Sequence, residues 1–106
     1  MRFINVEEIE EKELIPGYHA RFINSETMTF AHWRIEASAE FPEHSHPNEQ
    51  VINMLEGEFI IRIDGIDYPL QKGNVFIIPA GIPHSGKAIS DCKTIDVFYP
   101  LRAEYK

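Results

Sequence analysis

The sequence predicts one all-β domain, an antiparallel sandwich or barrel, and three observations support this prediction. The chain has 106 residues, which is a common size for a single domain. From residue 18 onward, short apolar runs alternate with turn residues. No segment shows the periodic apolar pattern, about ten residues or longer, that a crossover helix between parallel strands would need. We therefore expect one domain over residues 1–106.

The N-terminal arm, residues 1–17, differs in composition from the rest of the chain. It is acidic from Glu7 to Glu13 and ends at Pro16-Gly17, a pair of residues that breaks regular structure. The arm holds a short helical turn or is simply solvated, and the sequence leaves both alternatives open. The strands are expected to start after it, with the barrel over about residues 28–100.

Two strands are expected first, over residues 18–23 and 28–35, with a turn at 24–26 between them. Successive side chains of a strand point to opposite faces. One face of the second strand carries Ala31, Trp33 and Ile35, and the other carries Phe30, His32 and Arg34. Both faces of this strand are therefore expected to be covered, and His32 is a candidate to line the barrel interior.

Six more strands are expected toward the C-terminus, each bounded by turn residues. Their ranges are 49–55, 58–63, 68–70, 74–78, 83–88 and 93–99. Glycines at positions 57, 65, 73 and 81 mark the turns between them. The short, regular spacing favours a sandwich or barrel.

The charge balance limits the partners of the protein. Asp and Glu number 17 against 10 Lys and Arg, which gives a net charge of −7. This excess of negative charge opposes general binding to phosphate backbones or anionic membranes. No apolar run approaches the ~20 residues needed to span a bilayer. We expect neither a nucleic-acid partner nor a membrane partner.

The chain has a single cysteine, Cys92. It cannot close an intramolecular disulfide, which is usual for proteins of a reducing compartment, and the start of the chain lacks the apolar core of a signal peptide. We therefore expect a cytoplasmic protein in which Cys92 is structural.

Three of the five histidines lie in two short segments, residues 44–50 and 79–84. His44 and His46 are two positions apart, so on an extended segment they project to the same side and can converge on one metal ion. Gln50 has the same parity, although Pro47-Asn48 interrupts the strand. As alternatives, the pair are ordinary hydrogen-bonded histidines and His84 is a turn residue after Pro83. His19 and His32 lack a partner in a matching motif and are not expected to be ligands.

These segments resemble the two signature motifs of the cupin superfamily. The first is His44-x-His46-x3-Gln50-x6-Gly57, and the second is Gly73-x5-Pro79-x-Gly81-x2-His84. The resemblance implies a small jelly-roll-like β-barrel, commonly a homodimer, with a divalent metal at its centre. It implies that the metal ligands are His44, His46, Gln50 and His84.

The chain departs from these motifs at two positions. Gln50 stands where the family usually has Glu, and Ala88 replaces a frequent Asn at the end of the second motif. Glu49 competes for the ligand role, but only Gln50 satisfies both gaps of the first motif. Three imidazoles and an amide are neutral, so a bound divalent ion keeps its full charge, is a stronger Lewis acid and is held less tightly. Such donors suit Fe, Mn, Ni, Zn or Cu.

The C-terminal segment Asp96-x-Phe98-x3-Arg102-x2-Tyr105, together with the first motif, is similar to the KdgF-type pectin-degradation cupins. Asn48 departs from these relatives, which often carry another His there. The resemblance implies an enzyme that converts a 4,5-unsaturated uronate, a small acidic sugar, to its linear keto form. It places Asp96, Phe98 and Arg102 in the substrate pocket.

The chemistry of these residues agrees with that function. Arg102 can bind the uronate carboxylate as a bidentate pair, and Asp96 can move a proton. Alternatively, Asp96 and Arg102 form a surface ion pair, and Phe98 is a core residue. Two other functions stay open, an Fe²⁺-dependent dioxygenase and a non-catalytic module that binds a small ligand or sugar.

Overall fold

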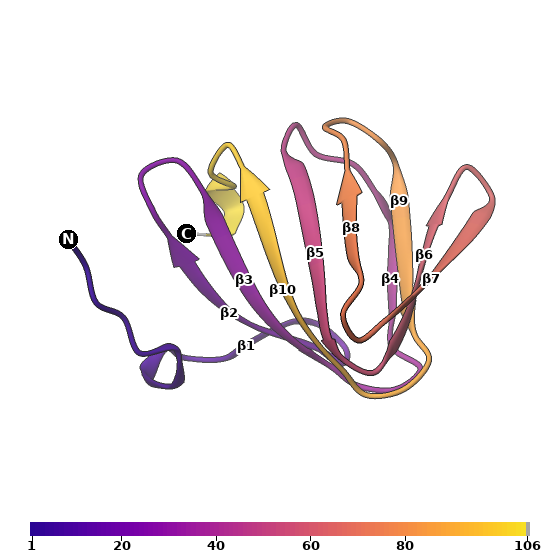
Figure 1. The fold of residues 1–106 in the computed structure, drawn as a ribbon, viewed down its shortest axis with the longest axis horizontal. Helices are drawn as coiled ribbons and strands as arrows, with labels where there is room; N and C mark the ends of the chain where they lie inside the picture. The colour runs from indigo at the N-terminus through magenta and orange to yellow at the C-terminus, as the bar shows by residue number, and fades with distance from the viewer. Residues whose placement is uncertain (106) are drawn as a thin grey trace.

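The computed structural model describes residues 1–105 and shows two antiparallel sheets facing each other (Figure 1). The larger sheet has the strand order β1-β2-β3-β10-β5-β8, and the smaller has the order β4-β9-β6-β7. The strands are β1 (Lys12–Ile15), β2 (Tyr18–Asn24), β3 (Thr29–Ile35), β4 (Glu40–His44), β5 (Glu49–Glu56), β6 (Glu58–Ile63), β7 (Ile66–Gln71), β8 (Val75–Ile78), β9 (His84–Ala88) and β10 (Cys92–Tyr99). The prediction of one all-β domain with a jelly-roll architecture is confirmed.

The alternation expected for the second strand holds in β3. Ala31, Trp33 and Ile35 are buried between the sheets, whereas Arg34 is exposed on the outer face. His32 shares that outer face, so the expectation that it lines the barrel interior is wrong. Its neighbour β10 follows the same rule, because every second residue from Cys92 to Phe98 is buried.

The core between the sheets is rich in aromatic rings. Tyr18 meets Trp33 edge-on with ring centroids 5.9 Å apart, and Phe41 in the same way at 5.1 Å. Tyr105, in the C-terminal turn η2 (Ala103–Tyr105), stacks on Phe22 at 4.4 Å. Such pairs contribute about 0.5–1.5 kcal/mol each beyond area burial. The C-terminal turn η2 is therefore packed into the barrel.

Two strands, β1 and β4, lie where none was expected. Each is the first strand in the order of its sheet, and both are mostly exposed. An edge strand without a buried face lacks the alternating pattern by which the other strands were recognised. β1 belongs to the N-terminal arm, which also contains a short 3₁₀ turn, η1 (Val6–Glu8). Within residues 1–105, no helix is long and apolar enough to cross a membrane.

The turn at Gly57, between β5 and β6, requires glycine. Its φ is +86°, in the left-handed region, and an added Cβ would lie 2.1 Å from the carbonyl oxygen of Asp91. No side chain fits at that distance. Gly57 thereby lets the chain reverse tightly as it passes from β5 in the larger sheet to β6 in the smaller one.

Candidate metal centre

Three histidines converge inside the barrel. His44, at the end of β4, is the cross-strand partner of His84 on β9, and their ring centroids lie 4.4 Å apart. His46 follows in the connection to β5, with its ring 5.2 Å from that of His84. One ring nitrogen from each residue lies within 4.8 Å of the other two. The structure therefore brings together the three histidines named from the sequence.

Backbone carbonyls orient all three imidazoles. The Nδ1 atoms of His44, His46 and His84 lie 3.1, 3.0 and 2.8 Å from the carbonyl oxygens of Pro42, Asn48 and Ile82, respectively. A carbonyl only accepts hydrogen bonds, so each Nδ1 carries the proton and each Nε2 presents a lone pair. Among residues 1–105, His84 Nε2 is the buried side-chain N or O atom without a hydrogen-bond partner. Such an orphaned acceptor fits a metal ligand.

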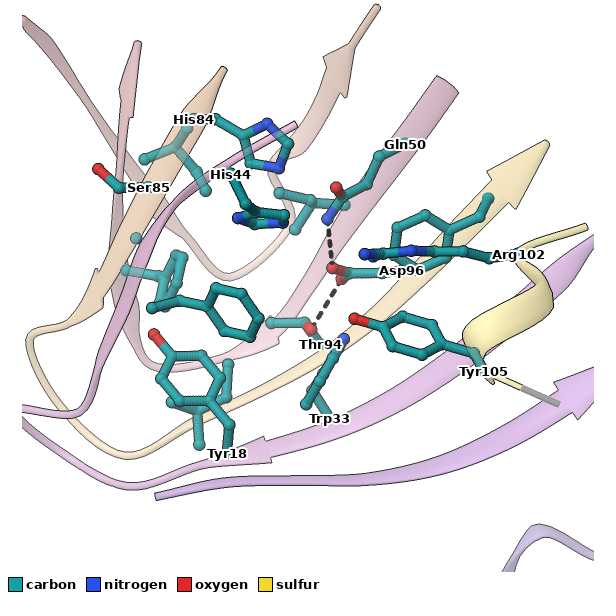
Figure 2. Close-up of a pocket in the computed structure, with 17 residues that line it drawn as sticks. Tyr18, Trp33, His44, Gln50, His84, Ser85, Thr94, Asp96, Arg102 and Tyr105 are labelled. Carbon is teal, nitrogen blue, oxygen red and sulfur yellow. Dashed lines mark hydrogen bonds between the residues drawn. The ribbon is translucent and has the colours of Figure 1, made fainter. Parts of the chain in front are cut away.

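Gln50 completes the set of donor atoms. It is buried on β5 while Glu49 is exposed, so of these two residues Gln50 faces the histidines. Gln50 Oε1 lies 3.0 Å from His46 Nε2, and Gln50 Nε2 donates to Asp96 Oδ2 at 2.8 Å (Figure 2). Two acceptor atoms at 3.0 Å repel each other unless a proton or a cation lies beside both. The four side chains therefore fit a divalent cation.

The electrostatic environment keeps these histidines in the form that binds metals. Burial is the largest effect and lowers the pKa of His44 to about 4, with smaller contributions from His84 and Arg102. Burial also lowers the pKa values of His46 and His84, again with the Arg102 charge acting in the same direction. Neutral imidazole is the ligating form, so near pH 7 the site needs no deprotonation before a metal binds.

Asp96 lies behind Gln50, on the interior face of β10. Its Oδ2 accepts from Gln50 Nε2, and its Oδ1 accepts from Thr94 Oγ1 at 2.9 Å. Burial raises the pKa of Asp96 to about 7, against the lowering effect of these two hydrogen bonds. The carboxyl group can therefore change its protonation state near neutral pH.

Arg102 lies beyond the end of β10, and it is buried. Its guanidinium carbon is 5.1 Å from the ring centroid of Phe98 and 4.2 Å from that of Tyr105. Its Nε donates to Glu104 Oε1 at 2.6 Å, so the acidic partner of Arg102 is Glu104 and not Asp96. The alternative of a surface ion pair between Asp96 and Arg102 is therefore not found. Phe98 is both a core residue and a wall of the site.

A cavity of about 50 Å³ joins these groups. His44, Gln50 and His84 lie at one side of it, and Asp96 and Arg102 at another (Figure 2). The sequence had not identified several of its other lining residues, among them Tyr18, Trp33, Thr94 and Tyr105. Thr94 had a usable signal, because it has the same strand parity as Asp96. Tyr18 and Trp33 had none beyond their aromatic character.

A second group of titratable side chains lies outside the barrel, around His19 on β2. His19 Nε2 is 2.8 Å from Glu36 Oε2 and 3.5 Å from Glu13 Oε2, and Nδ1 is 3.9 Å from Glu11 Oε1. Both ring nitrogens thus face carboxylates, unlike those of the interior histidines. Glu11 also forms an ion pair with Arg34 at 2.8 Å.

Comparison with known proteins relates the chain to a family. Over 57 residues, 52% of this chain, it is 39% identical to the HTH-type transcriptional regulator PuuR of Escherichia coli, and the match spans 31% of that regulator. An RmlC-like cupin from Shewanella frigidimarina superposes with a TM-score of 0.92 at 24% identity, covering 100% of this chain and 96% of the other. KdgF from Halomonas sp. superposes with a TM-score of 0.89 at 22% identity, covering 97% and 98%.

These two structural likenesses show a shared fold. The model of the cupin domain family matches residues 31–98, which run from within β3 to the last-but-one residue of β10 and include all four candidate ligands. The resemblance noted from the two histidine motifs is confirmed: this chain belongs to the cupin family.

Proposed function

We propose that the protein holds one divalent transition-metal ion through His44, His46, Gln50 and His84, and that it converts a 4,5-unsaturated uronate to the linear keto form. One observation carries the proposal: His44, Gln50 and His84 line one cavity with a carboxyl group and a guanidinium, and His46 converges with the other two histidines. The ion, when bound, would lower the pKa of a substrate hydroxyl or polarise a ring oxygen. Fe, Mn, Ni, Zn and Cu all suit these donors.

Arg102 is placed to bind the substrate carboxylate. The rings of Phe98 and Tyr105 and the carboxylate of Glu104 hold the guanidinium in place, so little side-chain entropy is lost on binding. Glu104 occupies Nε, which leaves other guanidinium N–H groups for a bidentate pair with an acidic ligand. A protein with a net charge of −7 can thereby bind an acidic sugar, because Arg102 and the metal ion supply positive charge inside the cavity.

Asp96 would transfer the proton that ring opening requires. A pKa of about 7 is close to the optimum for a general acid or base at neutral pH, and such a group contributes ~10²–10⁴-fold to the rate. Thr94 can form a hydrogen bond with Asp96 in both protonation states of the carboxyl group. Its hydroxyl donates to Asp96 Oδ1 when Asp96 is ionised, and it can rotate to accept a hydrogen bond from the carboxyl O–H when Asp96 is neutral.

The cavity must enlarge for a sugar acid to enter. Its volume of about 50 Å³ accommodates one or two water molecules, whereas pockets for organic ligands usually measure ~300–1,000 Å³. Arg102 and Tyr105 belong to the C-terminal segment beyond β10, and each is held by a hydrogen bond to another part of the chain. Arg102 N donates to Thr29 Oγ1 at 2.9 Å, and Asn24 Nδ2 donates to the Tyr105 carbonyl at 3.1 Å. Displacement of this segment to open the cavity would have to break these two hydrogen bonds, and their re-formation would return Arg102 to its place.

The test is to incubate the metal-loaded protein with 4,5-unsaturated galacturonate and to follow loss of the alkene by NMR or UV absorbance. We expect a rate well above that in buffer, and an Asp96→Asn variant that is at least ~10²-fold slower. The absence of acceleration, with metal confirmed in the protein, would overturn the proposed activity.

Two other functions would give different results. An Fe²⁺ dioxygenase needs open coordination positions for substrate and O₂, and it would consume oxygen with its substrate. A non-catalytic binding module is suggested by the match to the transcriptional regulator. It would bind a small acidic sugar with saturation and no turnover, and Asp96→Asn would still bind.

We also propose that the protein is a cytoplasmic homodimer. The outer face of the larger sheet has exposed apolar side chains: Leu55 on β5, Val75 and Ile77 on β8, and Tyr99 on β10. A second copy of the chain would remove this apolar patch from water. Sedimentation at micromolar concentration is expected to give a dimer, and a monomer would count against this assignment.

A further inference from the structure

Gln50 is a ligand with two chemically opposite ends. Its amide oxygen can bind a metal, but its NH₂ group cannot. Rotation of the terminal torsion by half a turn exchanges the two ends with little change in shape. Something in the barrel must therefore determine which end faces the histidines.

Asp96 lies where it can select the orientation of the Gln50 amide. Its carboxylate lies on the side of Gln50 away from His46, and its Oδ2 accepts from Gln50 Nε2 at 2.8 Å. The opposite orientation of the amide would place Gln50 Oε1 against Asp96 Oδ2, and two acceptors would then meet in a buried site. We propose that Asp96 is a positioning residue that fixes the oxygen of Gln50 toward the three histidines.

Without Asp96, the Gln50 amide would form a better hydrogen bond to His46 in the reversed orientation. His46 Nδ1 donates to the carbonyl of Asn48, so His46 Nε2 is an acceptor. The NH₂ group of a reversed Gln50 would donate to this Nε2 at the distance now spanned by Oε1, 3.0 Å. That single hydrogen bond would occupy two of the four donor residues. Asp96 therefore prevents a hydrogen bond between Gln50 and His46 that would occupy the metal site.

The strand register places the two residues together. Phe98 is the cross-strand partner of Gln50, and Asp96 is the partner of Ile52, so Gln50 and Asp96 are diagonal neighbours on the inner face. Thr94, the next residue on that face, donates to the other oxygen of Asp96 and restrains its rotation. Two ionised carboxylates at 2.8 Å would repel, so a glutamate at position 50 would conflict with the ionised form of Asp96. Gln50 and Asp96 are thus a matched pair.

The experiment measures metal affinity, and it rests on the metal site of the proposed function. Zn²⁺ affinity is measured by competition with a chromophoric chelator for the full chain and for Asp96→Asn, Gln50→Glu and the double variant. Asp67→Asn is the matched control, because Asp67 is exposed and pairs with Arg62 on the smaller sheet. Circular dichroism confirms that each protein is folded.

Asn at position 96 offers Gln50 a donor as well as an acceptor, so it no longer selects one orientation of the amide. We therefore expect Asp96→Asn to bind Zn²⁺ ~10–100-fold more weakly, the usual effect of losing a group that orients a ligand, and Asp67→Asn to bind like the wild type. In the double variant, the amide introduced at position 96 can donate to the carboxylate introduced at position 50, which returns an oxygen to the site. Gln50→Glu should therefore raise affinity more in the Asp96→Asn background than in the wild type. An equal effect in both backgrounds, or unchanged affinity in Asp96→Asn, would overturn the inference.

The experiment distinguishes two negative outcomes: the absence of the metal site, and the absence of a positioning role for Asp96. A wild-type protein that binds no Zn²⁺ refutes the site, and the positioning role with it. A wild type that binds, with Asp96→Asn binding equally well, refutes the positioning role alone. If Asp96→Asn does not fold, Thr94→Val replaces it, because loss of the hydroxyl lets Asp96 rotate. This variant is expected to bind Zn²⁺ several-fold more weakly, and unchanged affinity would count against the inference.

Discussion

Two groups of histidines in this protein show how surroundings decide what an imidazole can do. Inside the barrel, backbone carbonyls bind Nδ1 of His44, His46 and His84, and the Nε2 atoms converge with no carboxylate among them. Outside, His19 has carboxylates near both nitrogens, with Glu36 at 2.8 Å. The first group presents lone pairs to the cavity, whereas the ring nitrogens of the second face carboxylates.

The difference arises from the position of each group in the sheets. The interior histidines come from two paired strands and the connection after β4, where side chains point into the cavity. His19 lies on the outer face of β2, where neighbouring strands and loops place glutamates in solvent. Burial without a counter-charge keeps the interior imidazoles neutral, which is the form that binds a metal. The interior group is therefore the better metal ligand.

The largest expected effect is on metal binding. His84→Ala should reduce Zn²⁺ affinity by at least ~100-fold, because it removes one of four donors and leaves its place empty. His19→Ala is the matched control and should retain wild-type affinity and one ion per chain. Competition with a chelator and elemental analysis measure both quantities. Equal losses in the two variants would erase the distinction between the groups.

A second effect should appear in recognition of the acidic substrate. Arg102→Lys keeps the charge but loses the planar fork and its contacts with Phe98 and Tyr105. We expect a fall in kcat/KM, or in affinity if the protein only binds, of ~10–100-fold. Arg34→Lys changes an arginine of the exterior group, whose partner is Glu11, and should have no effect. A loss of kcat/KM or affinity in Arg34→Lys with none in Arg102→Lys would contradict the assignment of Arg102 to the substrate carboxylate.

A third effect concerns stability against pH in protein freed of metal by a chelator. His44 has a pKa of about 4 when folded and near 6.5 when unfolded, so between these values the unfolded chain binds more protons. Stability from this group is complete above pH 6.5 and is lost as the pH falls toward 4. The slope for one histidine is at most about 1.4 kcal/mol per pH unit.

Asp96 acts in the opposite direction, because its raised pKa of about 7 favours the folded state when the carboxyl takes up a proton. The comparison must therefore be between variants. His44→Gln should lose less stability than the wild type between pH 6.5 and 4.5 in denaturant titrations. A parallel loss in both proteins would show that His44 is not the group responsible.

The smallest effect is expected in the exterior group. His19→Gln removes contacts with partly exposed carboxylates, and exposed ion pairs contribute about 0–1 kcal/mol. We expect a loss of unfolding free energy within that range at pH 6, and a smaller loss in 1 M salt, where exposed charges are screened. A loss above about 2 kcal/mol would show that this group is part of the structural core.

The sequence predicted those strands that have one buried face. In β3, the alternation of Ala31, Trp33 and Ile35 with polar residues carries the signal, and the glycine turns mark the boundaries of several other strands. The edge strands β1 and β4 were missed because backbone pairing alone defines them, and β4 even contains Pro42. Pairing partners distant in sequence leave no local pattern.

The sequence predicted most residues of the candidate site, but not the contacts between them. Parity and spacing pointed to His44, His46 and Gln50 together, and the second motif pointed to His84. The hydrogen bond from Gln50 to Asp96 joins residues 46 positions apart, and it depends on the register of β5 and β10. The same register and the packing of the C-terminal turn bring Thr94 and Tyr105 to the cavity. Such contacts follow from tertiary packing, which one sequence does not reveal.

The most direct test of a metal centre inside the barrel is anomalous diffraction from crystals grown with Zn²⁺. The account predicts one strong anomalous peak per chain, within ligand distance of the Nε2 atoms of His44, His46 and His84 and of Gln50 Oε1. It predicts no comparable peak beside His19. A peak at His19 with none among the interior histidines would contradict the account.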